Sequence, residues 1–196
     1  MKITKLFIVV FTLIAFSFTV SNAQEKANYT ADTSNSTINW KGYKPTGSHH
    51  GTINLESGEL KMKNGKITGG SFIANMSTIK DAGGSTKLER HLKSDDFFDV
   101  AAFSTCKFEI TGSEIIDGKT VLTGDMTIKG ITKQLTFPVI VTEKADTVTL
   151  TSETFQVNRA EFNVKYKSKT FFNNLKEKFI KNEFDLQVAI TAVKQP

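Results

Sequence analysis

Strict alternation of apolar and polar side chains is the feature that most constrains the fold of this 196-residue chain. In residues 183–193 every second residue is apolar, and residues 122–128 and 135–141 repeat the pattern. Successive side chains of a β-strand point to opposite faces, so this spacing predicts strands with one dry face and one wet face. A further strand is expected around Trp40.

Dipeptides that contain glycine separate or interrupt these predicted strands. Asn64-Gly65, Asp117-Gly118 and Lys129-Gly130 are typical of tight hairpin turns. The alternation changes phase at Ser57-Gly58 and again at Gly69-Gly70, which indicates bulges that bend strongly curved sheets. Many strands with short connections and hardly any helix predict a single all-β domain, either a sandwich or a closed barrel.

Two segments depart from the strand pattern. Thr86 and Glu89 have the spacing of a capping box, which predicts a short helix over residues 87–93. Residues 169–181 mix phenylalanines with charged residues, and we expect a loop with a helical turn that packs through its aromatic face.

The first 23 residues have the pattern of a secretory signal peptide. Lys2 and Lys5 precede an apolar run over residues 6–20, and small residues at 21–23 suit a signal peptidase. The run is shorter than the roughly 20 residues of a membrane-spanning helix, although a retained anchor is the alternative. We therefore expect a mature domain of residues 24–196 that is exported, to the periplasm or to the outside of the cell.

Charge and cysteine content limit the partners. The net charge of +5 falls by two when the signal peptide is removed, and no Lys/Arg run remains. This balance argues against a nucleic-acid partner, whereas transient contact with anionic membrane head groups stays open. Cys106 is the single cysteine, so it is either a small buried side chain or the site of an intermolecular bridge.

Few residues are candidates for chemistry. His91 and Asp95 stand four apart and could form a base with its orienting acid, or a structural hydrogen bond that ties the helix to the next strand. His49 and His50 are neighbours, so an extended chain would point only one of them at a given metal. The sequence contains no Gly-x-Ser-x-Gly motif and no complete phosphate-binding loop. We expect no enzyme activity, no metal and no cofactor.

Three separated blocks carry a resemblance to a known family. Residues 91–100 (HLKSDDFFDV), residues 122–133 (LTGDMTIKGITK) and Gly51-Thr52 resemble the signature of the YceI-like family, and the resemblance extends from about Tyr29 to Val193. It implies an eight-stranded antiparallel lipocalin-like barrel with a short helical insertion, exported to the periplasm. Some members bind polyisoprenoids and some form dimers, and no catalytic residues are implied.

The chain departs from the family pattern at three positions. Ser104 stands where proline is common, and Lys129 stands where histidine or asparagine is common. Asn163 replaces a glycine, which puts the local turn in question because asparagine adopts positive φ less freely than glycine.

The main hypothesis is therefore an exported protein that carries or buffers one apolar, isoprenoid-type lipid. An eight-stranded barrel is wide enough either to be filled by side chains or to hold one small ligand. The alternatives are a filled barrel that acts as a stress or envelope interaction module, and a hydrolase or isomerase that uses His91 and Asp95. The candidate lipid-binding residues are Trp40, Phe72, Met76, Leu92, Phe97, Phe98, Phe108, Leu122, Met126, Phe137, Phe155, Phe162 and Phe172.

Overall fold

The computed structural model describes residues 26–196, so the predicted signal peptide lies outside the described residues. Ten antiparallel strands, one α-helix and two short 3₁₀ helices follow one another along this part of the chain. Their bounds are β1 (Lys26–Ala31), β2 (Thr37–Lys44), β3 (Gly47–Lys63), β4 (Lys66–Asp81), α1 (Thr86–Lys93), β5 (Thr105–Ile116), β6 (Lys119–Ile128), β7 (Ile131–Lys144), β8 (Thr147–Ser152), β9 (Phe155–Asn158), η1 (Arg159–Phe162), η2 (Lys176–Lys178) and β10 (Glu183–Lys194). No helix in this range is both long and apolar enough to cross a membrane.

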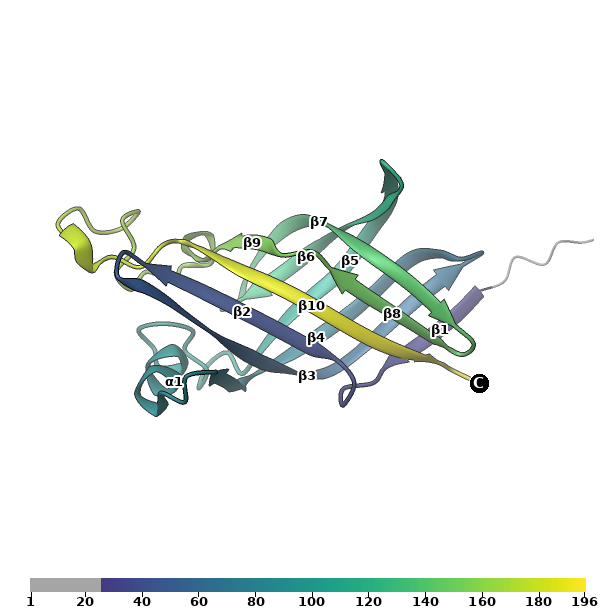
Figure 1. Ribbon diagram of the computed structural model, residues 1–196, viewed down its shortest axis with the longest axis horizontal. Coiled ribbons are helices and arrows are strands. Elements are labelled where there is room, and N and C mark those ends of the chain that lie inside the picture. The colour runs from purple at the N-terminus through teal and green to yellow at the C-terminus, as the bar shows by residue number, and fades with distance from the viewer. Residues whose placement is uncertain (1–25) are drawn as a thin grey trace, which may run out of the picture.

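The strands form a closed ring of eight positions (Figure 1). β2 to β8 pair in sequence order, and β10 pairs with both β8 and β2. β1 continues the line of β2 between β3 and β10, while β9 continues the line of β8 beside β10. The predicted eight-stranded antiparallel barrel with a helical insertion is confirmed.

Two positions of the ring consist of two strands with a break between them, and at each break a serine hydroxyl hydrogen-bonds to β10. Between β1 and β2, the Ser36 hydroxyl accepts a hydrogen bond from the Thr191 amide at 3.1 Å and donates one to the Asp32 carbonyl at 2.6 Å. Between β8 and β9, the Ser152 hydroxyl accepts from the Val188 amide at 2.9 Å. Both amides belong to β10, so this strand keeps hydrogen-bond partners on its two sides despite the breaks.

The predicted turns and bulges are in place. Asn64-Gly65, Asp117-Gly118 and Lys129-Gly130 join β3 to β4, β5 to β6 and β6 to β7, and all six residues have positive φ. That conformation gives the tight hairpin whose twist matches the strands. The pairing of β3 with β4 shifts register between Leu55 and Ser57, where the alternation changes phase. Asn163 has φ 58° and ends η1, so asparagine supports this turn in place of glycine.

The helix begins one residue earlier than predicted. Ser85 is the N-cap, and its hydroxyl accepts from the Leu88 amide at 3.3 Å. Glu89 therefore does not complete a capping box with Thr86. Its carboxylate instead accepts from Lys80 Nζ at 3.1 Å and from the Asp81 amide at 3.2 Å, which ties α1 to the end of β4. The hydrogen bond from Lys80 is the main cause that lowers the pKa of Glu89.

The expected packing of residues 169–181 is wrong. The helical turn is present as η2, but Phe171 and Phe172 are exposed at 39% and 47%. The loop is held from its base instead, by Arg159 of η1. The buried guanidinium donates to the carbonyls of Val164, Ile180 and Lys181 at 2.7, 3.0 and 3.0 Å. Burial lowers the pKa of Arg159 to about 10, so it remains cationic at neutral pH.

Replacement of Arg159 should destabilise the protein strongly. Arg159→Met leaves three carbonyls without their donors, and we expect the free energy of unfolding to fall by about 3 kcal/mol. Arg159→Lys should recover less than half of that loss, because one ammonium cannot span all three carbonyls. Urea unfolding followed by circular dichroism measures both. The control is Arg90→Met on the exposed face of α1. Equal midpoints for Arg90→Met and Arg159→Met would contradict a stabilising role for the three hydrogen bonds of Arg159.

Candidate ligand cavity

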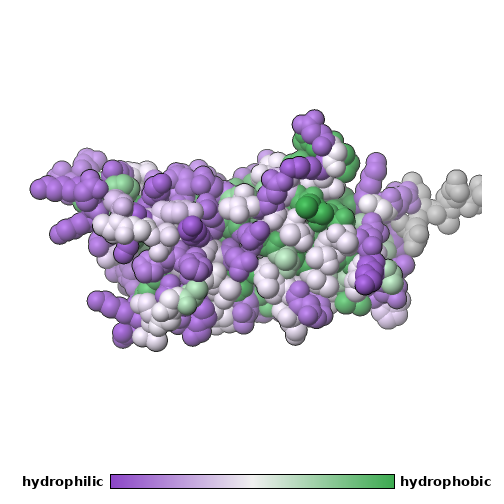
Figure 2. Space-filling view, in the orientation of Figure 1, coloured by the Kyte–Doolittle hydropathy of each residue, from purple (hydrophilic) through white to green (hydrophobic). Residues whose placement is uncertain are grey.

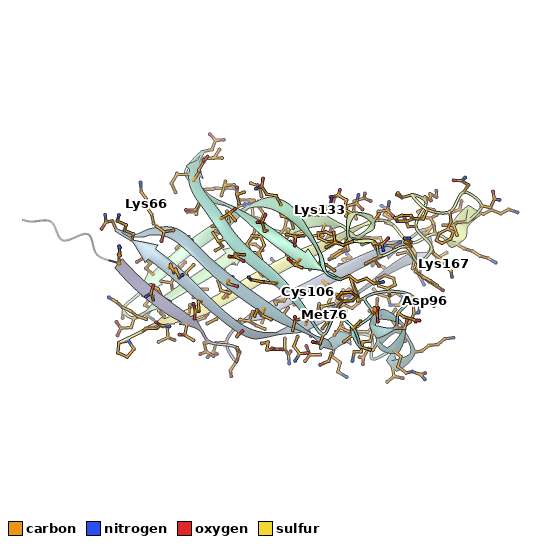
Figure 3. All side chains as sticks on the ribbon, turned by 180° about the vertical axis from the view of Figure 1, so that it is seen from behind. Lys66, Met76, Asp96, Cys106, Lys133 and Lys167 are labelled. Atoms are coloured by element: carbon orange, nitrogen blue, oxygen red, sulfur yellow. The ribbon has the colours of Figure 1, made fainter. Side chains whose placement is uncertain are left out.

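The barrel interior divides into a packed half and a hollow half. Toward the chain termini, the side chains of Tyr29, Leu60, Ile67, Val148 and Ala192 are buried against one another. Toward the end that carries α1, a cavity of about 110 Å³ remains between the strands. Figure 3 shows Met76 and Cys106 in this region of the barrel, far from Lys66 at the opposite end.

The cavity wall is almost entirely apolar. Its lining residues are Ile38, Ile53, Leu55, Phe72, Ala74, Met76, Phe98, Cys106, Lys107, Phe108, Met126, Ile128, Phe137, Phe155, Phe184, Leu186, Val188 and Ile190. Lys107 is the one charged residue among them, and its ammonium is ion-paired with the exposed Glu109. The wall thus offers a ligand apolar contact and a single thiol, which suits hydrocarbon and disfavours polar groups.

Two glycines shape the wall around aromatic rings. A methyl group on Gly124 would lie 2.4 Å from the Phe108 ring, and one on Gly58 would lie 2.4 Å from the Phe72 ring. The absent side chains therefore let both rings lie flat against the neighbouring strand. Across the cavity, Phe137 stacks on Phe155 with ring centroids 4.0 Å apart and contacts Phe108 at 5.2 Å.

Cys106 is half-buried and lines the cavity. It pairs with Ala74 across β4 and β5, and both residues line the hollow. Burial raises the pKa of the Cys106 thiol to about 12, so it is protonated and unreactive at neutral pH. The interpretation of Cys106 as a small buried side chain therefore fits its position in the barrel.

Seven of the thirteen candidate residues line this cavity and six lie elsewhere. The seven are Phe72, Met76, Phe98, Phe108, Met126, Phe137 and Phe155. Sequence analysis missed eleven others, among them Leu186, Val188 and Ile190 of β10 and Ile38 of β2. The alternation of residues 183–193 did contain the signal for the β10 group, because their shared dry face is the face that lines the cavity.

The six remaining candidates fall into three environments. Trp40 is buried beside the cavity and donates from Nε1 to the Lys80 carbonyl at 3.2 Å. Leu92, Phe97, Leu122 and Phe162 are buried in packed parts of the core rather than along the hollow. Phe172 is 47% exposed, so its assignment to the cavity wall is wrong.

The hydrogen bond proposed between His91 and Asp95 is not made. The His91 ring packs edge-on against Tyr166 at 4.3 Å and Phe97 at 5.8 Å, and its buried Nε2 has no hydrogen-bond partner within residues 26–196. Asp95 Oδ1 instead accepts from the Asp96 amide. Neither the base and orienting acid nor the structural tie between helix and strand is therefore present.

His49 and His50 are neighbours in β3, so the chain is extended there. Nδ1 of His49 is 3.5 Å from the buried carboxylate of Asp81. No cluster of three or more His, Cys, Asp or Glu side chains is placed to hold a metal in residues 26–196.

A second hollow of about 430 Å³ lies outside the barrel at the same end. It is lined by Asp95, Asp96, Lys129, Asn163, Lys165, Tyr166, Lys167, Phe172 and Leu175. Lys129 Nζ donates to the carbonyls of Asp95 and Phe97 at 3.3 and 3.1 Å, which joins the β6–β7 turn to the segment after α1. Figure 3 shows Asp96 and Lys167 together at this end.

Solved structures share this architecture. BcnA of Burkholderia cenocepacia superimposes with a TM-score of 0.69 at 17% identity, covering 82% of this chain and 98% of that one. A polyisoprenoid binding domain from Saccharophagus degradans gives 0.62 at 11% identity, covering 85% and 98%. The YceI protein of Campylobacter jejuni gives 0.53 at 16% identity, covering 67% and 74%. The superpositions show a common fold, and at these sequence identities they show the fold alone.

Sequence comparison agrees with the fold. A UPF0312 protein of Shewanella denitrificans is 26% identical over 132 residues, which are 64% of this chain and 68% of the relative. A UPF0312 protein of Pseudomonas fluorescens is 31% identical over 105 residues, which are 51% and 53% of the two chains. The profile of the YceI-like domain matches residues 29–192, nearly the whole barrel, and the chain therefore belongs to the YceI-like domain family.

Proposed function

We propose that this protein is an exported, periplasmic lipid-binding protein that carries or buffers one apolar, isoprenoid-type lipid inside its barrel. The observation that carries the proposal is the cavity inside the barrel, whose wall is almost entirely apolar. The structural likeness to a polyisoprenoid binding domain supports the ligand class. The N-terminal signal pattern of residues 1–23 supports export.

The size of the cavity limits how a long chain can enter. At about 10–15 Å³ for each water-sized group, the hollow has room for on the order of ten heavy atoms, or two isoprene units. A longer lipid must therefore displace side chains. Phe98, Phe155 and Phe184 are half-buried at the α1 end, and Met76 and Met126 are flexible, so these five are the residues that would move.

The energetics favour exchange over storage. A bilayer holds an isoprenoid chain at about 0.8 kcal/mol per buried methylene, and an apolar cavity provides a similar environment. Rearrangement of the aromatic side chains also opposes uptake. The free energy of transfer between membrane and barrel is then close to zero, which suits a carrier or buffer of the lipid.

The direct test is mass spectrometry of protein purified without detergent from its native envelope. We expect an intact mass equal to residues 24–196 plus one apolar adduct that disappears after organic extraction. A clean mass, with no uptake of isoprenoid quinones or fatty acids on incubation, would contradict the lipid role and favour the interaction module. A mass that includes residues 1–23 would contradict export by cleavage.

A cavity-filling variant should separate binding from folding. Ala74→Leu adds three carbon atoms to the cavity wall, so we expect loss of the bound chain and stability within about 2 kcal/mol of wild type. Adduct occupancy and thermal unfolding measure the two effects. The matched control is Ala101→Leu in the exposed segment after α1, which should retain lipid. Equal occupancy in both variants would place the ligand outside this cavity.

The thiol of Cys106 should report access to the cavity. The rise of its pKa from 9.0 to about 12 lowers the thiolate fraction at pH 8 by about a thousandfold. Iodoacetamide alkylation of the native protein should therefore be at least about a hundredfold slower than that of the urea-unfolded chain. An apolar ligand that covers Sγ should slow the reaction further. Similar rates for native and unfolded protein would show that Cys106 is accessible and the cavity open to water.

A further inference from the structure

The connection between η1 and β10 contains an unusual concentration of positive charge. Residues 165–181, called here the basic loop, include a single acidic residue, Glu177. Six lysines lie in the same stretch: Lys165, Lys167, Lys169, Lys176, Lys178 and Lys181. The loop, with η2, projects from the barrel end that also carries α1 (Figure 1). Mostly hydrophilic side chains cover this end of the molecule in the view of Figure 2.

None of the six lysines is in an ion pair within residues 26–196. Several lie against aromatic rings: Lys169 Nζ is 3.6 Å from the Phe179 ring centroid, and Lys165 Nζ is 5.4 Å from that of Phe171. Asp95 and Asp96 line the second hollow together with Lys165 and Lys167, so they offset part of this charge. Lys169, Lys176 and Lys178 are exposed and lie outside that hollow.

Two neighbouring phenylalanines are exposed among these charges. Phe171 and Phe172 are 39% and 47% exposed, although a packed core lies nearby. Their backbone is held in place, because both amides donate to the Ser168 carbonyl, at 3.1 and 3.0 Å. Ser168 is itself fully buried and hydrogen-bonded through its hydroxyl to Asn182. The exposure of the two rings is therefore part of the ordered loop.

We propose that the basic loop docks this protein onto the surface of an anionic lipid bilayer, with Phe171 and Phe172 inserted among the lipids and the lysines at the phosphate level. Paired apolar and cationic side chains match the two layers of a membrane interface, since rings partition into the acyl boundary while ammonium groups remain with the head groups. An acidic protein would match the lysines but would leave the exposed rings unexplained.

The position of the basic loop also suits lipid exchange. It leads directly into β10, whose Phe184 lines the cavity three residues after Lys181. The half-buried rings that must move for a chain to enter lie at the same end of the barrel. Docking depends on surface residues alone. Vesicle binding can therefore be confirmed or contradicted whether or not the cavity holds a lipid.

Sedimentation with sucrose-loaded vesicles tests the proposal on the full mature chain. We expect binding to vesicles of 70% phosphatidylcholine and 30% phosphatidylglycerol, and little binding to phosphatidylcholine alone. Each lysine near an anionic surface contributes a factor of about five, so the triple variant Lys169→Gln, Lys176→Gln, Lys178→Gln should bind about a hundredfold more weakly. Raising the salt from 0.05 to 0.5 M should weaken wild-type binding and have less effect on this variant.

The apolar contribution is tested by Phe171→Ser with Phe172→Ser, which should lower vesicle binding at least about tenfold. These side chains are exposed, so circular dichroism should show an unchanged fold.

Matched controls lie at the opposite end of the barrel. The first control is the triple variant Lys26→Gln, Lys66→Gln, Lys144→Gln, which removes the same charge. The second is the double variant Ile115→Ser, Ile116→Ser, which removes two exposed apolar side chains. Both controls should bind like wild type. The proposal is overturned if the controls weaken binding as much as the loop variants, or if wild type ignores anionic vesicles. It is also overturned if soluble polyglutamate competes fully and the phenylalanine pair has no effect, which would favour an acidic protein partner.

Discussion

The closure of the hydrogen-bonded ring by β10 is the interaction on which the rest of this structure depends. An open sheet would leave two unpaired edges and could not enclose an apolar space. β10 pairs with β2 on one side and with β8 on the other. The strand line on each side has one break, between β1 and β2 and between β8 and β9. Ser36 and Ser152 supply side-chain acceptors for β10 amides at those breaks. Two serine hydroxyls thus maintain the pairing that makes the interior a closed volume.

Within that closed ring, the two halves of the interior are lined by different side chains. Toward the termini, aliphatic side chains such as Leu60 and Val148 are buried against one another in the core. Toward α1, rigid rings such as Phe137 and Phe155 stack on each other instead of filling the centre. The cavity is the space left between these rings and the aliphatic side chains of β2, β3 and β10.

That end also carries the features that a lipid carrier would need outside its barrel. Half-buried rings stand at the cavity, and the basic loop places cationic and aromatic side chains beyond it. Arg159 lies between the two, since its guanidinium donates to the carbonyls of Ile180 and Lys181 in the basic loop and lies 5.4 Å from the Phe97 ring. The Phe97 ring in turn packs against Phe98, a cavity-lining residue, with ring centroids 5.0 Å apart.

Local patterns predicted the parts of the fold that depend on local physics. The hairpin turns at Asn64-Gly65 and Asp117-Gly118 followed from residues that tolerate positive φ, and the bulge near Ser57 followed from a change of phase. Environments set by distant residues were harder to predict. Trp40 lies on a correctly predicted strand, yet its indole turns to the Lys80 carbonyl. Phe172 looked like a core residue, but Ser168 and Asn182 hold its loop outward.

The sequence by itself determined the strand pattern and the turns, because alternation and glycine placement are properties of neighbouring residues. These patterns left a sandwich and a barrel open, and the resemblance to the YceI-like family decided for the barrel. Only the tertiary structure decided which apolar faces line a hollow and which close against one another. It also decided that His91 packs against aromatic rings and makes no hydrogen bond with Asp95, and that the phenylalanines of the basic loop are exposed. The physical reason is that cavity, burial and exposure depend on how eight strand positions meet around a ring, and those contacts join residues far apart in the chain.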